Sequence, residues 1–354
     1  MRGRGRAALV AALVALVALV ATSCGGPSTV RSALSVRGNL LVDQAGRRFV
    51  VKGVTVEVVP FYAASDEAAT LLTGATDAEF ANREEVFRSI RAAGANTVRI
   101  PVSADVYRSL SAKAAADYLN RLSASVAAAT ANGLTVIIGW WDSLAAGSAL
   151  PDQVGGWLPA MKAVADLFRR DPSVLYEPMN EPNDVEWTTW RSVTARVVSY
   201  WRKVIGYRGP LVLDTSGYSW NFDPASADAI IALDKGLLGR ADVVFANHRY
   251  ANQNTCFCGP EKQAFVDTIE GVVGKYAILG TEYGAFNGAN PPHLEWNAEF
   301  LDYLATTSIP AGLNGAVAFV WHWIDPNTIA QPGTATLTPW GQIVEQELLA
   351  RRLP

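Results

Sequence analysis

The chain has 354 residues, of which 50% are hydrophobic and 18% are charged, and its formal net charge is −3. This length allows one large barrel or two ordinary domains, and no disordered tract is evident. From Cys24 onward the chain carries 27 basic and 33 acidic residues. Nucleic-acid binding is not expected, because it depends on basic patches.

The first residues predict an export signal over 1–23. Three arginines within the first six residues precede an unbroken run of Ala, Leu and Val over 7–21. That run is shorter than the roughly 20 residues of a membrane span. The context of Cys24 resembles a bacterial lipoprotein processing site, although an alanine stands at a position where leucine is more usual. We expect a lipidated tether over 24–35, which predicts a location on the outer face of the cytoplasmic membrane. Release after ordinary cleavage and a retained anchor are the alternatives.

Short apolar runs then alternate with helical patterns, which is typical of βα units around a parallel sheet. A hairpin is expected first, from Asn39–Val42 and Arg48–Val51. Eight strands are expected after it, at Val50–Val56, Thr97–Pro101, Leu134–Trp140, Val174–Met179, Leu211–Asp214, Val243–His248, Ala277–Glu282 and Ala316–Trp321.

Helical patterns separate these runs, and only the segment Pro224–Leu238 is ambiguous between helix and loop. No change in composition marks a second domain. The sequence therefore predicts a single (β/α)8 TIM barrel over residues 36–354, with a short β-hairpin at its start.

Two glutamates stand where strand-like runs end in Gly- or Pro-bearing turns. Glu181 belongs to Tyr-Glu-Pro-Met-Asn-Glu-Pro at 176–182, and Glu282 to Ile-Leu-Gly-Thr-Glu-Tyr-Gly at 278–284. Strands of such a barrel bring their carboxyl ends to one rim, so the two carboxyl groups should converge. A pair of carboxyl groups is what hydrolysis of a glycosidic bond requires.

The chain resembles glycoside hydrolase family 5, the cellulase and mannanase group of retaining enzymes on a TIM barrel, over roughly residues 36–345. The resemblance centres on Asn180 and Glu181 in Asn-Glu-Pro. Matching positions follow in the expected order: Arg99 in Asn-Thr-Val-Arg-Ile-Pro, His248 and Tyr250 in Ala-Asn-His-Arg-Tyr, Glu282 in Thr-Glu-Tyr-Gly, and Trp321 in Phe-Val-Trp-His-Trp.

The resemblance implies the division of roles. Glu181 would be the acid/base, and Glu282 the nucleophile, kept ionised by Arg99 and Tyr250. The remaining matched residues would bind substrate, with Asn180 on the sugar 2-hydroxyl, His248 orienting Glu181 or a sugar hydroxyl, and Trp321 as the floor beneath the reacting ring.

Structural interpretations stay open beside these roles. Arg99 could be an ion-pair residue of the barrel core, and Trp321 a core aromatic. We expect Glu177, which lies one strand register away from Glu181, to be structural.

One position departs from the family pattern. Many family members end the third strand in Trp-His, whereas this chain has Trp140 followed by Trp141 and Asp142. An indole cannot replace an imidazole hydrogen bond to a sugar hydroxyl, so either that contact is missing or Trp140 or Asp142 replaces it. Ordinary cellulose activity is then doubtful, although the two-glutamate chemistry is not. Trp140 and Trp141 also count among the candidate sugar platforms, because indole faces stack on pyranose rings.

Cys256 and Cys258 flank a single residue. A local disulfide is favoured over two free thiols, because the compartment beyond the membrane is oxidising. The chain has three histidines and no paired Cys or His spacing, so neither a metal nor another cofactor is expected.

These patterns predict a retaining β-glycosidase of the cell envelope that acts on a β-linked glucan, mannan or related glycan. The alternatives are a transglycosylase or an exo-acting glycosidase on the same barrel, and a catalytically silent carbohydrate-binding lipoprotein. A purely structural envelope protein would not need the aromatic-rich rim. The expected partners are the glycan and, through the lipid alone, the membrane; no protein partner is evident.

Overall fold

The computed structural model describes residues 33–61, 77, 80–142, 147–252, 254–284, 293–322, 328–331 and 334–353. Residues 31–354 form one compact unit. The expected export signal and Cys24 lie outside the described residues. Among the helices that are described, none is long and apolar enough to cross a membrane.

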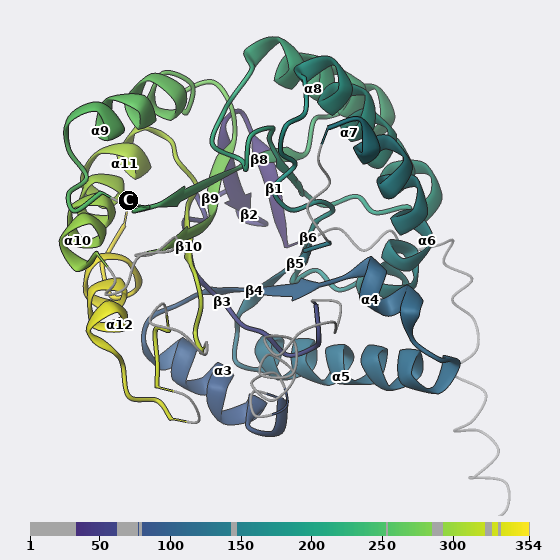
Figure 1. Cartoon of the computed structure of the whole chain (residues 1–354), viewed down its shortest axis with the longest axis horizontal. Helices are drawn as coiled ribbons and strands as arrows, with labels where there is room; N and C mark the ends of the chain where they lie inside the picture. The colour runs from purple at the N-terminus through teal and green to yellow at the C-terminus, as the bar shows by residue number, and fades with distance from the viewer. Residues whose placement is uncertain are drawn as a thin grey trace, which may run out of the picture. The chain divides into compact units, whose positions relative to one another are not determined.

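Eight parallel strands close into a barrel in which the last strand pairs with both the first and the seventh. The expected (β/α)8 fold is therefore confirmed, and the helices surround the ring of strands (Figure 1). The strands are β3 (Val51–Thr55), β4 (Thr97–Val102), β5 (Thr135–Trp140), β6 (Val174–Glu177), β7 (Leu211–Asp214), β8 (Val243–Tyr250), β9 (Ile278–Gly284) and β10 (Gly315–Ala318).

The ambiguous segment Pro224–Leu238 is a helix, α8. Asp223 accepts a hydrogen bond from the backbone N–H of Ser226 at its start, and Gly239 ends it in the left-handed conformation. The other helices are α3 (Arg83–Ala92), α4 (Ala104–Ser109), α5 (Ala112–Ala131), α6 (Leu150–Phe168), α7 (Trp187–Tyr200), α9 (Gly259–Phe265), α10 (Leu294–Tyr303), α11 (Ile309–Ala311) and α12 (Pro339–Val344). One 3-10 turn, at Gly147–Ala149, and π-helical turns at Trp201–Ile205, Val266–Glu270, Leu304–Ser308 and Glu345–Leu349 complete the set.

The expected hairpin is present, but it uses different strands. β1 (Leu34–Arg37) pairs with β2 (Leu40–Asp43) across a turn at Gly38, whose φ is +63°. The segment expected to pair, Arg48–Val51, contributes one isolated bridge, and its end begins β3.

Long-range contacts decide the pairing. The backbone N–H of Val36 donates to Asp242, and that of Leu41 donates to Asn314. Both acceptors stand just before barrel strands, so the hairpin lies at the amino end of the barrel, opposite the expected site.

Alternation along each strand sorts the core into two layers. Ile137, Leu175, Val212 and Val244 belong to one apolar cluster inside the barrel, which also contains Leu34 and Leu41 of the hairpin. Their sequence neighbours pack in the larger cluster between strands and helices. Because side chains alternate, a residue two positions after an inward one also points inward, toward the carboxyl end.

Candidate active site

A cluster of charged side chains fills the carboxyl end of the barrel interior. Glu177 and Asp214 stand two residues after the inward-facing Leu175 and Val212, and His248 stands four after Val244. All three are buried, together with Arg99 of β4. Buried charges are costly unless they are paired, so this cluster is a feature that needs a functional or structural reason.

The two predicted glutamates meet at this rim. One carboxylate oxygen of Glu181, one of Glu282 and one ring nitrogen of His248 lie within 4.8 Å of one another. Glu181 retains some exposure, with 17% of its side chain accessible, whereas the side chain of Glu282 is 7% accessible. The arrangement brings two carboxyl groups together at the carboxyl end of the barrel.

The position of Glu282 depends on a register shift in β9. His248 pairs with Glu282, while the preceding Asn247 pairs with Gly280, so Thr281 is an extra residue in β9. A bulge of this kind redirects the following side chain. Glu282 thereby points into the barrel, although simple alternation from the inward-facing Leu279 would place it on the helix side.

Arg99 connects the acids at the centre of the cluster. Its guanidinium donates from Nε to Glu177 at 2.5 Å, from Nη1 to Glu282 at 2.7 Å and from Nη2 to the amide oxygen of Asn180 at 2.6 Å. These bonds orient Asn180 with its oxygen toward Arg99. Gly139 of β5 makes room for the pair, because a Cβ there would lie 2.6 Å from Glu177 Oε2.

Burial raises the pKa of Glu181 to about 7, with the negative charge of Glu177 adding to the effect and Arg99 opposing it. Its Oε1 lies 2.7 Å from Nδ1 of His248, whose Nε2 lies 2.9 Å from the hydroxyl of Thr281. Burial lowers the pKa of His248 to about 4, so the imidazole is neutral near pH 7. Glu181 can therefore hold a proton at neutral pH, as a general acid must.

Glu282 has a different environment. Burial raises its pKa, as does the nearby Glu181, while Arg99 and the hydroxyl of Tyr250, which donates at 2.5 Å, act in the opposite direction. The two direct donors favour the ionised carboxylate that a nucleophile requires.

Trp141 lies inside this site. Its ring covers the guanidinium of Arg99 with 4.7 Å between the guanidinium carbon and the ring centroid. It stacks on Phe319, with centroids 5.5 Å apart and planes at 22°, and Phe319 also contacts Tyr250 at 6.1 Å. Two aromatic rings, Trp141 and the partly exposed Phe319, therefore form an apolar wall beside Glu282.

Two tryptophans that we expected at the site are core residues. Trp140 is 1% exposed and packs against Tyr176 and Trp201 between the strands and the helices, because alternation sends it to the opposite side from Trp141. Trp321 is also 1% exposed and belongs to that same helix-side core cluster. Among the described residues of this segment, the aromatic ring that contacts Tyr250 is that of Phe319.

Sequence reasoning missed Asp214 and Phe319, and it treated Glu177 as merely structural. Asp214 ends the run Leu-Val-Leu-Asp, and an acid that ends a buried strand is a signal that could have been followed. Asp142, considered as a substitute hydrogen-bond donor or acceptor, instead accepts from Ser103 Oγ and from the backbone N–H of Asp105 at the start of α4.

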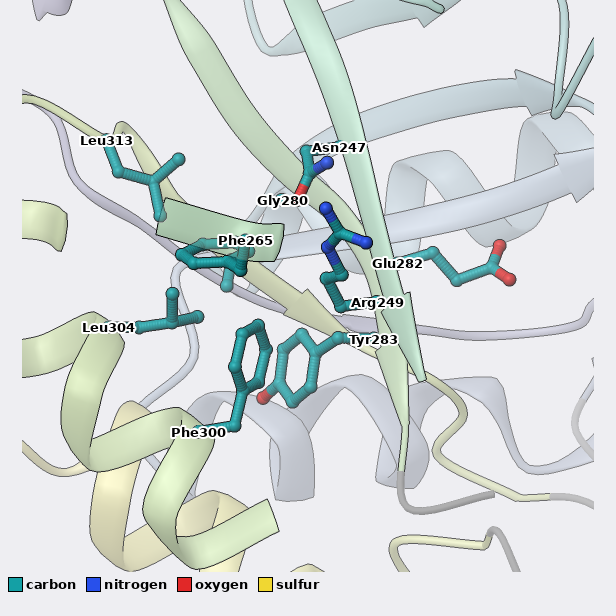
Figure 2. A pocket seen from close by; sticks show the side chains of 10 residues that line it. Asn247, Arg249, Phe265, Gly280, Glu282, Tyr283, Phe300, Leu304 and Leu313 are labelled. Carbon is teal, nitrogen blue, oxygen red and sulfur yellow. The ribbon is translucent and has the colours of Figure 1, made fainter. Parts of the chain in front are cut away.

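A small cavity lies on the other side of β8 and β9. Its lining includes Glu282 itself, with Asn247, Arg249 and Tyr283 of the same two strands and apolar side chains of the segments that follow them. Figure 2 shows the side chain of Glu282 directed away from Tyr283 and Phe300. The cavity and the site therefore share Glu282, whose carboxyl group is directed to the side of Arg99. Cys256 and Cys258 are joined by a disulfide in the segment that follows β8.

Within the part of the chain that the structure describes, two groups of side chains could offer three ligand atoms to a metal ion: Glu177, Asp214 and His248, and Glu181, His248 and Glu282. Each group contains one acid that pairs with the guanidinium of Arg99, Glu177 in the first and Glu282 in the second. A divalent cation would have to compete with that guanidinium, so the donor set fits acid/base chemistry better than metal binding.

Comparison with known proteins identifies a family model that matches most of the chain and solved structures that share its fold. A family model described as "Cellulase (glycosyl hydrolase family 5)" matches residues 58–325. No curated protein matches the chain by sequence. Among solved structures, a β-mannanase from Streptomyces thermolilacinus is 19% identical with a TM-score of 0.65, covering 91% of this chain and 98% of its own. The endoglucanase catalytic domain from Thermobifida fusca is 18% identical with a TM-score of 0.61, covering 92% and 99%. At these identities the likeness shows the shared fold.

Proposed function

Since the chain belongs to glycosyl hydrolase family 5, the cellulase family, and is a glycoside hydrolase, we propose that it is a retaining β-glycosidase acting on a β-linked glucan, mannan or related glycan. The observation that carries the proposal is the pair Glu181 and Glu282, with carboxylate oxygens within 4.8 Å of each other beside a neutral histidine. Retaining enzymes hold their two carboxyl groups about 5 to 5.5 Å apart, whereas inverting enzymes need about 6.5 to 9.5 Å to admit a water.

In the first step, a carboxylate oxygen of Glu282 attacks the anomeric carbon while the bond to the leaving oxygen breaks. Glu181 gives its proton to that oxygen, and the sugar becomes an ester of Glu282. In the second step, the Glu181 carboxylate takes a proton from water, whose oxygen attacks the anomeric carbon and releases Glu282. The hydrogen bond to His248 holds Glu181 in place through both proton transfers.

Arg99 and Tyr250 each contact Glu282, so they would bias it toward the ionised form before attack and as the leaving carboxylate afterward. Asn180 is oriented by Arg99, which leaves its amide nitrogen as the group that can donate to the sugar 2-hydroxyl. Arg99 would therefore orient both Glu282 and Asn180.

The related solved structures and the aromatic wall of the site support the proposed substrate class. The related solved structures include a Streptomyces thermolilacinus β-mannanase with mannohexaose and an endoglucanase, so mannan and glucan are both reasonable backbones. Trp141 stands in place of an imidazole, and its ring packs on Arg99 and Phe319, so a sugar hydroxyl near this position would lose a hydrogen bond. We therefore expect poor activity on plain cellulose.

A panel of β-linked oligosaccharides tests the proposal. The whole chain, in detergent if it stays with membranes, should release products of retained anomeric configuration from at least one mannan, mixed-linkage glucan or substituted glucan oligomer, as followed by NMR. Inverted products would refute the mechanism. Binding without cleavage across the whole panel would favour the carbohydrate-binding alternative, and dominant transfer to a sugar acceptor would favour the transglycosylase.

We also propose that the chain is exported and anchored by a lipid on Cys24, on the strength of the arginines, the apolar run and the cysteine context alone. Cys24→Ser should abolish incorporation of a labelled fatty acid and move the protein out of the membrane fraction or leave it unprocessed. Cys258→Ser serves as the matched control and should keep the label. Membrane association that persists unlabelled in Cys24→Ser would contradict the proposal.

A further inference from the structure

Three buried carboxyl groups surround a single guanidinium in the barrel interior. Arg99 contacts Glu177 at 2.5 Å and Glu282 at 2.7 Å, and Asp214 is buried beside them. Burial keeps the neighbouring His248 neutral near pH 7, so it adds no charge. If all three acids were ionised, the cluster would bury two uncompensated negative charges, which is costly in a site closed to water.

Two oxygens of this cluster have no hydrogen-bond donor. Glu177 uses Oε2 for Arg99, and Asp214 uses Oδ2 for the backbone N–H of Glu181 at 2.8 Å. The remaining oxygens, Glu177 Oε1 and Asp214 Oδ1, are buried without a partner among the described residues. An oxygen of each side chain lies within 4.8 Å of the other and of a His248 nitrogen. One proton between the two carboxyl groups would satisfy both orphan oxygens and remove one negative charge.

The bond from Glu181 to Asp214 restrains an unusual backbone. Glu181 has φ of 48°, the left-handed region that a residue with a side chain seldom adopts. Asp214 Oδ2 accepts the N–H of this residue and also lies 3.5 Å from His248 Nε2. The carboxyl group of Asp214 therefore contacts both the backbone of Glu181 and the imidazole of His248.

We infer that Glu177 and Asp214 share one proton, and that Asp214 is a positioning residue which holds the backbone of Glu181 so that its carboxyl group meets His248 and the substrate. Only the positioning role of Asp214 rests on the proposed function; the shared proton does not. Burial raises the pKa of Asp214 well above its ordinary value, with the adjacent Glu177 acting in the same direction, which agrees with a shared proton at neutral pH.

The shared proton has a spectroscopic signature that needs no substrate. At about pH 8.5, where Glu181 has lost its proton, the infrared spectrum should retain the C=O stretching band of a neutral carboxylic acid. Asp214→Asn should remove this band, as should Glu177→Gln. Asp242→Asn, which changes a buried carboxyl group at the amino end of the barrel, should keep it. A wild-type spectrum without the band, or a band that survives both Asp214→Asn and Glu177→Gln, would overturn the shared proton.

The positioning role has a kinetic signature. In Asp214→Asn the amide oxygen can still accept from Glu181 N–H and the amide nitrogen can donate to Glu177, so kcat should stay within about ten-fold of wild type. Asp214→Leu keeps the volume but offers neither bond, and kcat should fall on the order of 100-fold with little change in KM. Equal losses in the two variants, with circular dichroism showing both folded, would refute the positioning role. Inactivity of the wild type on every substrate would instead refute the proposed function and leave the infrared result standing.

Discussion

Glu282→Ala should abolish turnover of every substrate, with a loss on the order of 10⁵-fold in kcat, because no glycosyl ester can form without the carboxylate. Added azide should partly restore reaction by filling the vacated space and should yield a glycosyl azide of inverted configuration. Product stereochemistry by NMR measures this directly.

The control for this variant is Glu84→Ala, which removes an exposed carboxylate of α3 and should leave kcat unchanged. Substantial activity in Glu282→Ala, or an azide product of retained configuration, would show that Glu282 is not the nucleophile. The variant should fold, because Arg99 keeps its contacts with Glu177 and Asn180.

Glu181→Ala should separate substrates by their leaving groups. On an oligosaccharide, whose leaving oxygen needs a proton, kcat/KM should fall about 10²- to 10⁴-fold. A dinitrophenyl glycoside needs no proton, so formation of the glycosyl ester should persist, and azide should then give a product of retained configuration. Swapped azide stereochemistry between the Glu181 and Glu282 variants would reverse the two assignments.

The pH dependence of kcat/KM gives a second test of Glu181 as the general acid. Its pKa is raised to about 7, and the acid must be protonated in the free enzyme, so wild-type kcat/KM on an oligosaccharide should decline as the pH rises through about 7. In Glu181→Ala, this alkaline limb should be absent on the dinitrophenyl glycoside. An alkaline limb that persists there unchanged would assign it to another group.

The proposed proton shared by Glu177 and Asp214 has a consequence for the alkaline limb of the pH profile. The charge of Glu177 is among the causes that raise the pKa of Glu181, so the position of the limb depends on how much negative charge the pair carries. In this proposal, Glu177 and Asp214 would set the pKa of Glu181 in addition to holding its backbone.

Much of this protein follows from the sequence alone. Apolar runs of strand length bounded by turns and helical patterns predicted eight strands, and all eight form. Glu181, Glu282, Arg99 and His248 were also found from short motifs, and the structure brings them together at one rim. Local pattern suffices here, because strand length, strand ends and the residues at those ends are properties of consecutive residues.

Tertiary structure decided which face each of those residues presents. Trp140 and Trp141 are neighbours in the chain, yet alternation sends one to the helix side and the other over Arg99. The bulge at Thr281 turns Glu282 toward the barrel interior, and the local sequence pattern does not predict this bulge. The hairpin likewise uses Leu34–Arg37, since contacts with Asp242 and Asn314, more than 200 residues away, favour that pairing. The grouping of Glu177 and Asp214 with Arg99 depends on three separate strands meeting in a closed barrel, which only long-range packing produces.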